Sequence, residues 1–213
     1  MDYLGDAFVS TDWERLELPG GRHLLRDEVY GFLKVMPRPS DEEIASFYEN
    51  AYRNPCVPHD PDGRADIVCE HALRPGRVLD IGCGAGEFLA SFAARRWQTI
   101  GLEPGHLYVE KAWGRGIEVI EEPLTEGLVG RLGMFDVVLL VHVLEHLPYP
   151  EEMLRVIHKL LKPGGIFFCE VPNDFNALQE VAVPECGLRP WWIALPDHLN
   201  YFSIIKEYKS YYT

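Results

Sequence analysis

The sequence predicts an α/β fold, a doubly wound and mostly parallel sheet with helices on both faces. Two observations support this. From Arg77 onward, short apolar runs alternate with segments of helical periodicity. A glycine-rich turn over residues 82–86 joins the first of these runs to the first helix. Alternation at this spacing implies right-handed crossovers between parallel strands. With 213 residues, 47% of them hydrophobic, the chain suits one domain with a sizeable core and a small appendage.

The elements of this core can be placed in order. Strands are expected near 77–81, 98–102, 117–120, 135–141 and 166–171. Helices are expected near 86–95, 105–113 and 150–161. The last helix is well specified, because Pro150 and two acids open it and Pro163-Gly164-Gly165 end it.

Upstream of the core the pattern is weaker. Residues 1–39 show little periodicity and are expected to be irregular. Ser40-Asp41-Glu42-Glu43 reads as a capping box that opens a helix, which Asn54-Pro55 ends. A second helix is expected over 64–73. The expected domains are thus an N-terminal segment (1–39), a helical cap (40–76), a cofactor-binding core (77–173), and a substrate-side loop with a short C-terminal segment (174–213).

The glycine turn predicts a nucleotide-type cofactor, and two cofactors compete. A dinucleotide fold requires a small residue at the third position of G-x-G-x-x-G/A, where this chain has Glu87. The spacing is instead G-x-G-x-G, with Asp80 two residues before the first glycine. An acid there can face a cationic amino group. Glu103, about 20 residues beyond the glycines, can accept hydrogen bonds from both hydroxyls of a ribose. This role fits NAD and S-adenosylmethionine equally, because both contain adenosine.

The pattern of residues 135–173 decides between these two cofactors. A fourth strand is followed by Leu144-Glu145-His146, an amphipathic helix, Leu161-Lys162-Pro163-Gly164-Gly165 and a fifth strand. With the glycine turn and Glu103, this order resembles the class I S-adenosylmethionine-dependent methyltransferases, from about Ser40 to Ser203. The resemblance implies a Rossmann-like sheet with strand order 3-2-1-4-5. It also implies a C-terminal antiparallel hairpin, for which the ten residues Ile204–Thr213 leave no room. An open sheet edge is therefore expected.

The resemblance also assigns roles to single residues. It places Asp80, Gly82, Cys83 and Gly84 around the methionine part of the cofactor. Glu103 would hold the ribose, with Pro104 beside the adenine. The adenine edge would be recognised by Glu122 or by the backbone of Leu124, because Pro123 replaces the acid common just before that leucine. His142 would lie along the cofactor. Tyr48 and Tyr52 are candidate lids.

A hydroxyl or carbon acid acceptor needs a base, whereas a neutral amine does not. The candidates are His198, in a stretch similar to one that borders the substrate pocket of related methyltransferases, and His146. Each of these two histidines can instead be a neutral side chain that forms a hydrogen bond with a neighbouring loop. His142-x-x-Glu145-His146 also fits the H-x-x-E-H zinc motif, but that motif needs one long helix and Pro148 follows at once. No metal is expected.

Composition and charge limit the classes of partner that we expect for this chain. The net charge is −13 and no basic stripe is visible, so nucleic acid is not an expected partner. The longest clean apolar run, Val137–Val141, is too short to span a bilayer, so no membrane partner is expected. Five cysteines without a Cys-x-x-Cys pair predict reduced thiols and a cytoplasmic location.

These observations predict an S-adenosylmethionine-dependent methyltransferase that acts on a small molecule and releases S-adenosylhomocysteine. The acceptor atom, oxygen, nitrogen or carbon, stays open. One alternative is a catalytically inactive, cofactor-binding partner subunit. A less favoured one is an NAD-dependent oxidoreductase. A homodimer or a partner that covers the open sheet edge is also expected.

Overall fold

The computed structural model describes residues 16–50, 61–188 and 190–203. Two compact units share these residues. The first unit combines the chain up to Arg53 with Glu145–Pro148 and the chain from Val171 onward. The second holds Asn54–Leu144 and Tyr149–Glu170. The expected cap over 40–76 is therefore divided, with one helix in each unit.

The second unit contains the parallel sheet. Its strands are β3 (Arg77–Ile81), β4 (Gln98–Leu102), β5 (Val119–Ile120), β6 (Phe135–Val141) and β7 (Leu161–Glu170). They are arranged in the order β5-β4-β3-β6-β7, and every neighbouring pair is parallel. Counted within this sheet, the order is 3-2-1-4-5. The predicted fold class is confirmed.

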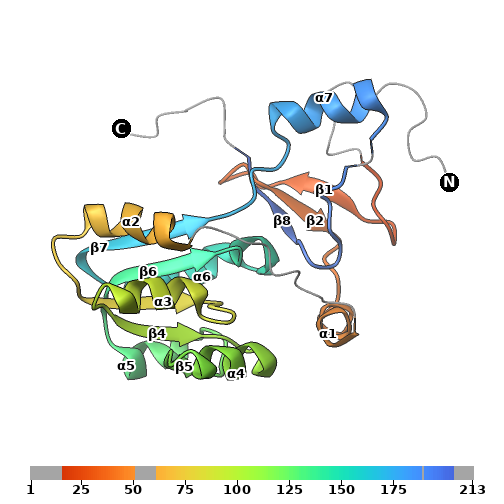
Figure 1. The fold of residues 1–213 in the computed structure, drawn as a ribbon. Helices are drawn as coiled ribbons and strands as arrows, with labels where there is room; N and C mark the ends of the chain where they lie inside the picture. The colour runs from red at the N-terminus through yellow and green to blue at the C-terminus, as the bar shows by residue number, and fades with distance from the viewer. Residues whose placement is uncertain (1–15, 51–60, 189, 204–213) are drawn as a thin grey trace. The chain divides into compact units, whose positions relative to one another are not determined.

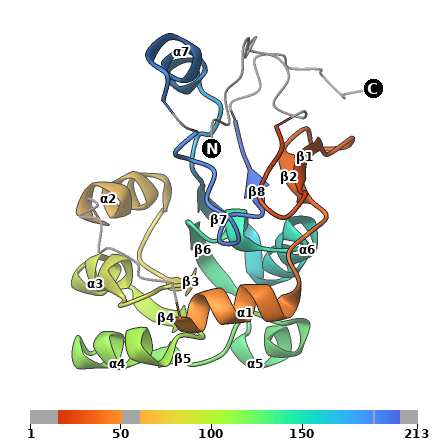
Figure 2. The ribbon, with the colours of Figure 1, turned by 90° about the vertical axis from the view of Figure 1, so that its right-hand side faces the viewer.

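Helices cover both faces of this sheet. They are α2 (Pro61–His71), α3 (Glu87–Ala94), α4 (His106–Gly114), α5 (Val129–Leu132) and α6 (Pro150–Leu160). Figure 2 shows α2, α3 and α4 on one face and α5 and α6 on the other. Between them lies a core that includes Val78, Leu89, Phe92 and Leu139, all fully buried. Burial on both faces explains why β3 and β6 read as continuous apolar runs.

The Lys162–Gly165 turn, expected before the fifth strand, lies within β7. Phe135 pairs with Leu161, but the next pair is Val137 with Ile166, so the residues between bulge out of the ladder. Asp136 fixes this bulge, because its carboxylate accepts hydrogen bonds from the Lys162 ammonium (2.7 Å) and the Arg77 backbone N–H (2.7 Å).

The first unit contains a small antiparallel sheet, β1-β2-β8, built from His23–Arg26, Leu33–Met36 and Asn200–Tyr201. Figure 1 shows the red and orange strands of the N-terminal region beside the blue β8. The expectation that residues 1–39 are irregular is wrong for this part. β1 and β2 are only four residues long, which is too short for a strong local pattern. The second partner of β2 is β8, which lies far along the chain.

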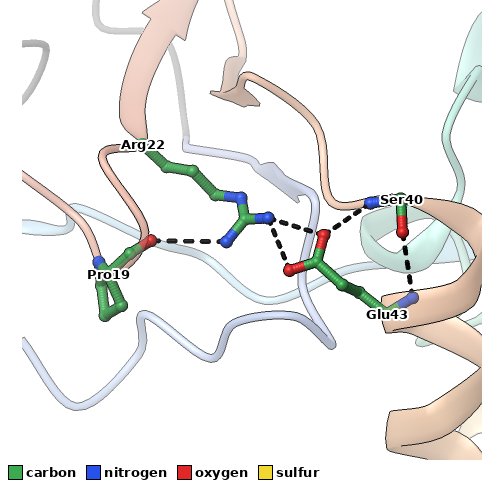
Figure 3. Close-up of polar contacts among 4 residues, drawn as sticks. All are labelled: Pro19, Arg22, Ser40 and Glu43. Carbon is green, nitrogen blue, oxygen red and sulfur yellow. Dashed lines mark hydrogen bonds and ion pairs between the residues drawn. The ribbon is translucent and has the colours of Figure 1, made fainter.

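The described part of the first unit also contains two helices, α1 (Asp41–Asn50) and α7 (Ala177–Cys186). The predicted capping box of α1 is present. The Glu43 N–H donates to Ser40 Oγ at 3.2 Å, and the Ser40 N–H donates to the Glu43 carboxylate at 2.8 Å. Arg22 Nη2 donates to both oxygens of the same carboxylate, at 2.7 and 2.8 Å, as Figure 3 shows. This contact joins the turn before β1 to the start of α1.

Helix α7 lies where the sequence predicted a loop. Asn176 caps it and Gln179 reaches back to the Asn176 backbone, which completes a second capping box. Gly187, in the left-handed conformation, follows its last residue. In the described residues no helix has the length and apolar character that crossing a membrane requires. The expectations for Tyr52 and for residues 204–213 fall outside the described residues.

Candidate functional site

The glycine turn between β3 and α3 forms the centre of the candidate site. Gly82 and Gly84 both have positive φ, 72° and 53°, which favours glycine. A Cβ at Gly82 would lie 2.5 Å from Val143 Cγ2, so the segment after β6 packs directly on this turn. A Cβ at Gly84 would meet nothing within 4 Å. Space therefore lies open beside the Gly84 backbone.

Glu103 links this turn to the end of β4. Its carboxylate accepts hydrogen bonds from the Gly84 N–H (3.0 Å) and the Gly105 N–H (2.8 Å). Glu103 is partly buried and the adjacent Pro104 is exposed. The acid predicted to hold a ribose is thus brought to the glycine turn, because β3 and β4 are parallel neighbours whose carboxyl ends meet at one edge.

Asp80 gives the site its electrostatic character. It is 3% exposed, and burial, together with the charge of Glu103, raises its pKa to about 8. Burial also raises the pKa of Glu103, against the two backbone hydrogen bonds that lower it. The same environment raises the pKa of the buried Cys83 thiol, mainly through desolvation. Two carboxyl groups that resist ionisation here are suited to a cationic ligand group, because a nearby cation favours their charged form.

The expected adenine side follows β5. Leu124 is buried, whereas Glu122 is exposed and pairs with Arg131 at 3.4 Å. One contact here was not predicted from the sequence: His106, the first residue of α4, lies 3.0 Å from Glu121. The Glu121 carboxylate, through its hydrogen bond and its charge, raises the pKa of His106. A local pattern did not reveal this pair, because the two residues come from different elements.

His142 follows β6 directly and has φ 53°, unusual for a residue with a side chain. Its Nε2 lies 3.1 Å from Glu170 Oε1, and Arg64 of α2 donates to the same oxygen. His142 belongs to the same unit as Asp80, the glycine turn and Glu103. The structure therefore brings together the expected methionine-side and ribose-side residues and the segment that carries His142.

The two candidate bases, His146 and His198, belong to the first unit, where their rings lie 5.0 Å apart, edge to face. His146 Nδ1 lies 3.0 Å from the Asp197 carboxylate, which also accepts a hydrogen bond from Tyr48 at 3.0 Å. Burial opposes the charged form of His146, but the hydrogen bonds and charge of Asp197, together with the charge of Glu145, outweigh burial and raise the pKa of this imidazole. Tyr48, a candidate lid, is thus held by Asp197.

The H-x-x-E-H segment does not form one helix, since Leu144–His146 is a 3-10 turn. Donor atoms of Glu145, His146 and His198 nevertheless lie within 4.8 Å of one another, a spacing that suits a metal ion. His142, the first histidine of the motif, belongs to the other unit. The geometry therefore differs from that of the zinc motif.

Comparison with known proteins identifies the family. Residues 44–206 match the family model described as "Methyltransferase domain". Among curated proteins, the ubiquinone biosynthesis O-methyltransferase of Escherichia fergusonii is 35% identical over 156 residues, which cover 65% of this chain and 64% of that protein. The enzyme of the same name from Acinetobacter baylyi is 31% identical over 121 residues, 52% of this chain and 51% of that protein. The chain thus spans less than two thirds of the length of these relatives.

Solved structures give similar matches. A SAM-dependent methyltransferase from Archaeoglobus fulgidus aligns with 63% of this chain and 59% of its own, at 23% identity and a TM-score of 0.47. DesVI of Streptomyces venezuelae aligns with 62% and 57%, at 20% identity and a TM-score of 0.46. Neither the family model nor the relatives favour an inactive partner subunit or an NAD-dependent oxidoreductase. The family model covers most of the chain, so the chain belongs to the methyltransferase-domain family, as its motifs predicted.

Proposed function

We propose that the chain transfers a methyl group from S-adenosylmethionine to a hydroxyl group of a small molecule. The observation that carries this proposal is the Glu103 carboxylate, which bridges the Gly84 and Gly105 N–H groups beside the buried Asp80. Family membership supports methyl transfer. The names of the relatives from E. fergusonii and A. baylyi support oxygen as the acceptor atom.

The residues present fit this cofactor. Two carboxyl groups with raised pKa values favour a ligand that carries positive charge, and the open space at Gly84 allows close approach to the backbone. Asp80 would hold the amino group, and Gly82, Cys83 and Gly84 would line the methionine part. Glu103 would accept the ribose hydroxyls. Pro104, Glu122 and Leu124 would border the adenine, and His142 would lie along the cofactor.

S-adenosylmethionine, when bound, supplies a methyl group on a sulfonium that becomes neutral on transfer. Because displacement is in line, the chain's contribution is alignment and exclusion of water. A hydroxyl acceptor must also lose its proton, and we assign this role to His198 or His146. Asp197 holds His146 by Nδ1, which leaves Nε2 as the atom that would receive a proton.

Isothermal titration calorimetry with S-adenosylhomocysteine tests the cofactor assignment. We expect binding by the folded chain and its loss in Asp80→Ala and Glu103→Gln. Glu118→Gln is the matched control, since Glu118 is an exposed glutamate outside the site. A folded wild-type chain that does not bind would refute the proposal. Methyl transfer is then assayed with labelled S-adenosylmethionine and a simple phenol, catechol and amine. Transfer to the amine alone would refute the hydroxyl assignment.

The chain's setting forms a further part of the proposal. We expect a small-molecule acceptor, neither nucleic acid nor membrane as a partner, and a cytoplasmic location. β7 is an edge strand of the described five-stranded sheet, which supports a second copy or another protein as its cover. Size-exclusion chromatography with light scattering separates a monomer from a homodimer.

A further inference from the structure

Three side chains meet at the carboxyl ends of β6 and β7. Glu170, the last residue of β7, lies with its Oε1 3.1 Å from His142 Nε2. Arg64 of α2 donates to the same oxygen. The side chains of Arg64 and Glu170 are 20% and 29% exposed, whereas that of His142 is 50% exposed. The carboxylate is therefore enclosed between two cationic or hydrogen-donating groups, and the imidazole is the member that solvent or a ligand reaches.

The backbone fixes this arrangement. Val141 pairs with Glu170 in the parallel ladder, and the His142 N–H donates to the Glu170 carbonyl at 2.9 Å. His142 has φ 53°, which is unfavourable for a residue with a Cβ. Such conformations persist where the surroundings require them, and they concentrate at functional sites.

The same segment packs on the glycine turn. Val143, the residue after His142, lies so close to Gly82 that a Cβ there would be 2.5 Å from Val143 Cγ2. His142 is thus one residue from a direct contact with the turn expected to hold the methionine part of the cofactor. Asp80 and Glu103 belong to the same unit, so this relation involves one compact body.

We propose that Glu170 is a positioning residue: it orients the His142 imidazole toward the sulfonium part of the cofactor, and Arg64 holds Glu170 in place. The inference rests on the proposed function. Glu170 also balances the charge of Arg64, which would otherwise repel a sulfonium. Its loss should therefore weaken binding of the cationic S-adenosylmethionine more than binding of S-adenosylhomocysteine, whose sulfur is neutral.

The test compares the two ligands by calorimetry in Glu170→Gln, which keeps a hydrogen-bond acceptor and removes the charge. One added net positive charge near the sulfonium should raise the Kd of S-adenosylmethionine about three- to tenfold. The Kd of S-adenosylhomocysteine should change by less than about twofold. The double variant Arg64→Gln/Glu170→Gln restores the net charge and should restore the ratio of the two Kd values. Glu118→Gln, an exposed glutamate, is the control.

Glu170→Ala adds the loss of the hydrogen bond to His142, so kcat should fall further than in Glu170→Gln. Glu170→Asp, which keeps both charge and acceptor, should recover part of it. Equal changes in the two Kd values in Glu170→Gln would overturn the inference, as would equal kcat values in the Ala and Gln variants. If the folded wild type binds neither ligand, the proposed function fails and this inference fails with it. If it binds both and the ratio stays constant in Glu170→Gln, only this inference fails.

Discussion

Gly84 offers a direct test of the candidate cofactor site. Glycine can be required there by the backbone conformation or by a ligand that needs the space, and the structure separates these two reasons. Its φ of 53° is unfavourable for any residue with a Cβ, yet a Cβ there would touch no protein atom within 4 Å. Gly116, which follows α4, has the same two properties, with φ 77° and nothing within 4 Å. The two positions are therefore matched in backbone strain and local space. They differ in that only Gly84 lies at the candidate cofactor site.

Alanine at either position should destabilise the fold by about 1–2 kcal/mol, the cost of the left-handed conformation. For a domain of this size each kcal/mol corresponds to about 2–4 °C in Tm. Both variants should thus melt about 2–8 °C below the wild type in differential scanning fluorimetry.

Binding of S-adenosylhomocysteine should separate the two variants. In Gly84→Ala the added methyl occupies space that the ligand needs, so Kd should rise about tenfold or more, the equivalent of about 1.4 kcal/mol. In Gly116→Ala the Kd should match the wild-type value. Equal affinities of the two variants for this ligand would show that the open space beside Gly84 is not the cofactor site.

The remaining predictions concern pH, the candidate bases and the capping box. The native chain holds a proton on Asp80 up to about pH 8, whereas an unfolded chain releases it near pH 4, so the free energy of unfolding of the ligand-free protein should fall as pH rises between these values. A bound cation favours the charged form of Asp80, so the ligand-bound protein should lose less stability as pH rises. The increase in Tm caused by S-adenosylmethionine should therefore grow from pH 5 to 8 in the wild type and stay constant in Asp80→Asn. Equal pH dependence of this increase in the two proteins would contradict the role of Asp80. His198→Ala should lower turnover by a factor of roughly 10²–10⁴ with little change in Kd for S-adenosylhomocysteine if His198 is the base. An unchanged rate would leave His146, for which His146→Ala is the matching variant, or an acceptor that needs no base. Ser40→Ala should cost about 0.5–2 kcal/mol in urea unfolding, since it removes the cap of α1, and a cost near zero would show that the Arg22–Glu43 contact alone holds that helix end.

The core could be predicted from sequence because its signals are local. β3 and β6 are short apolar runs that are almost completely buried, and α6 has its own start and stop residues, so the type and order of these elements follow from neighbours along the chain. The short helix α5 has no such signal and was not predicted. The glycine turn, Asp80 and Glu103 were placed in the same way, by strand ends that a parallel sheet brings to one edge. Helix α7 also has a local signal, the Asn176–Gln179 capping box and Gly187, which the sequence analysis did not use. It also contains Pro184, and proline is unfavourable inside a helix.

Tertiary structure alone decided the contacts between residues far apart in the sequence. The small sheet depends on the pairing of β2 with β8. Strands of two to four residues have too few alternating apolar and polar positions for this pairing to be predicted from the sequence. The Asp197 contact with His146 and the Glu170 contacts with His142 and Arg64 likewise join segments that no spacing rule connects. The sequence by itself therefore determined the family, the parallel core and the residue types of the candidate cofactor site. The partners that orient the histidines were decided by folding, because hydrogen bonds between distant side chains leave no periodic trace along the chain.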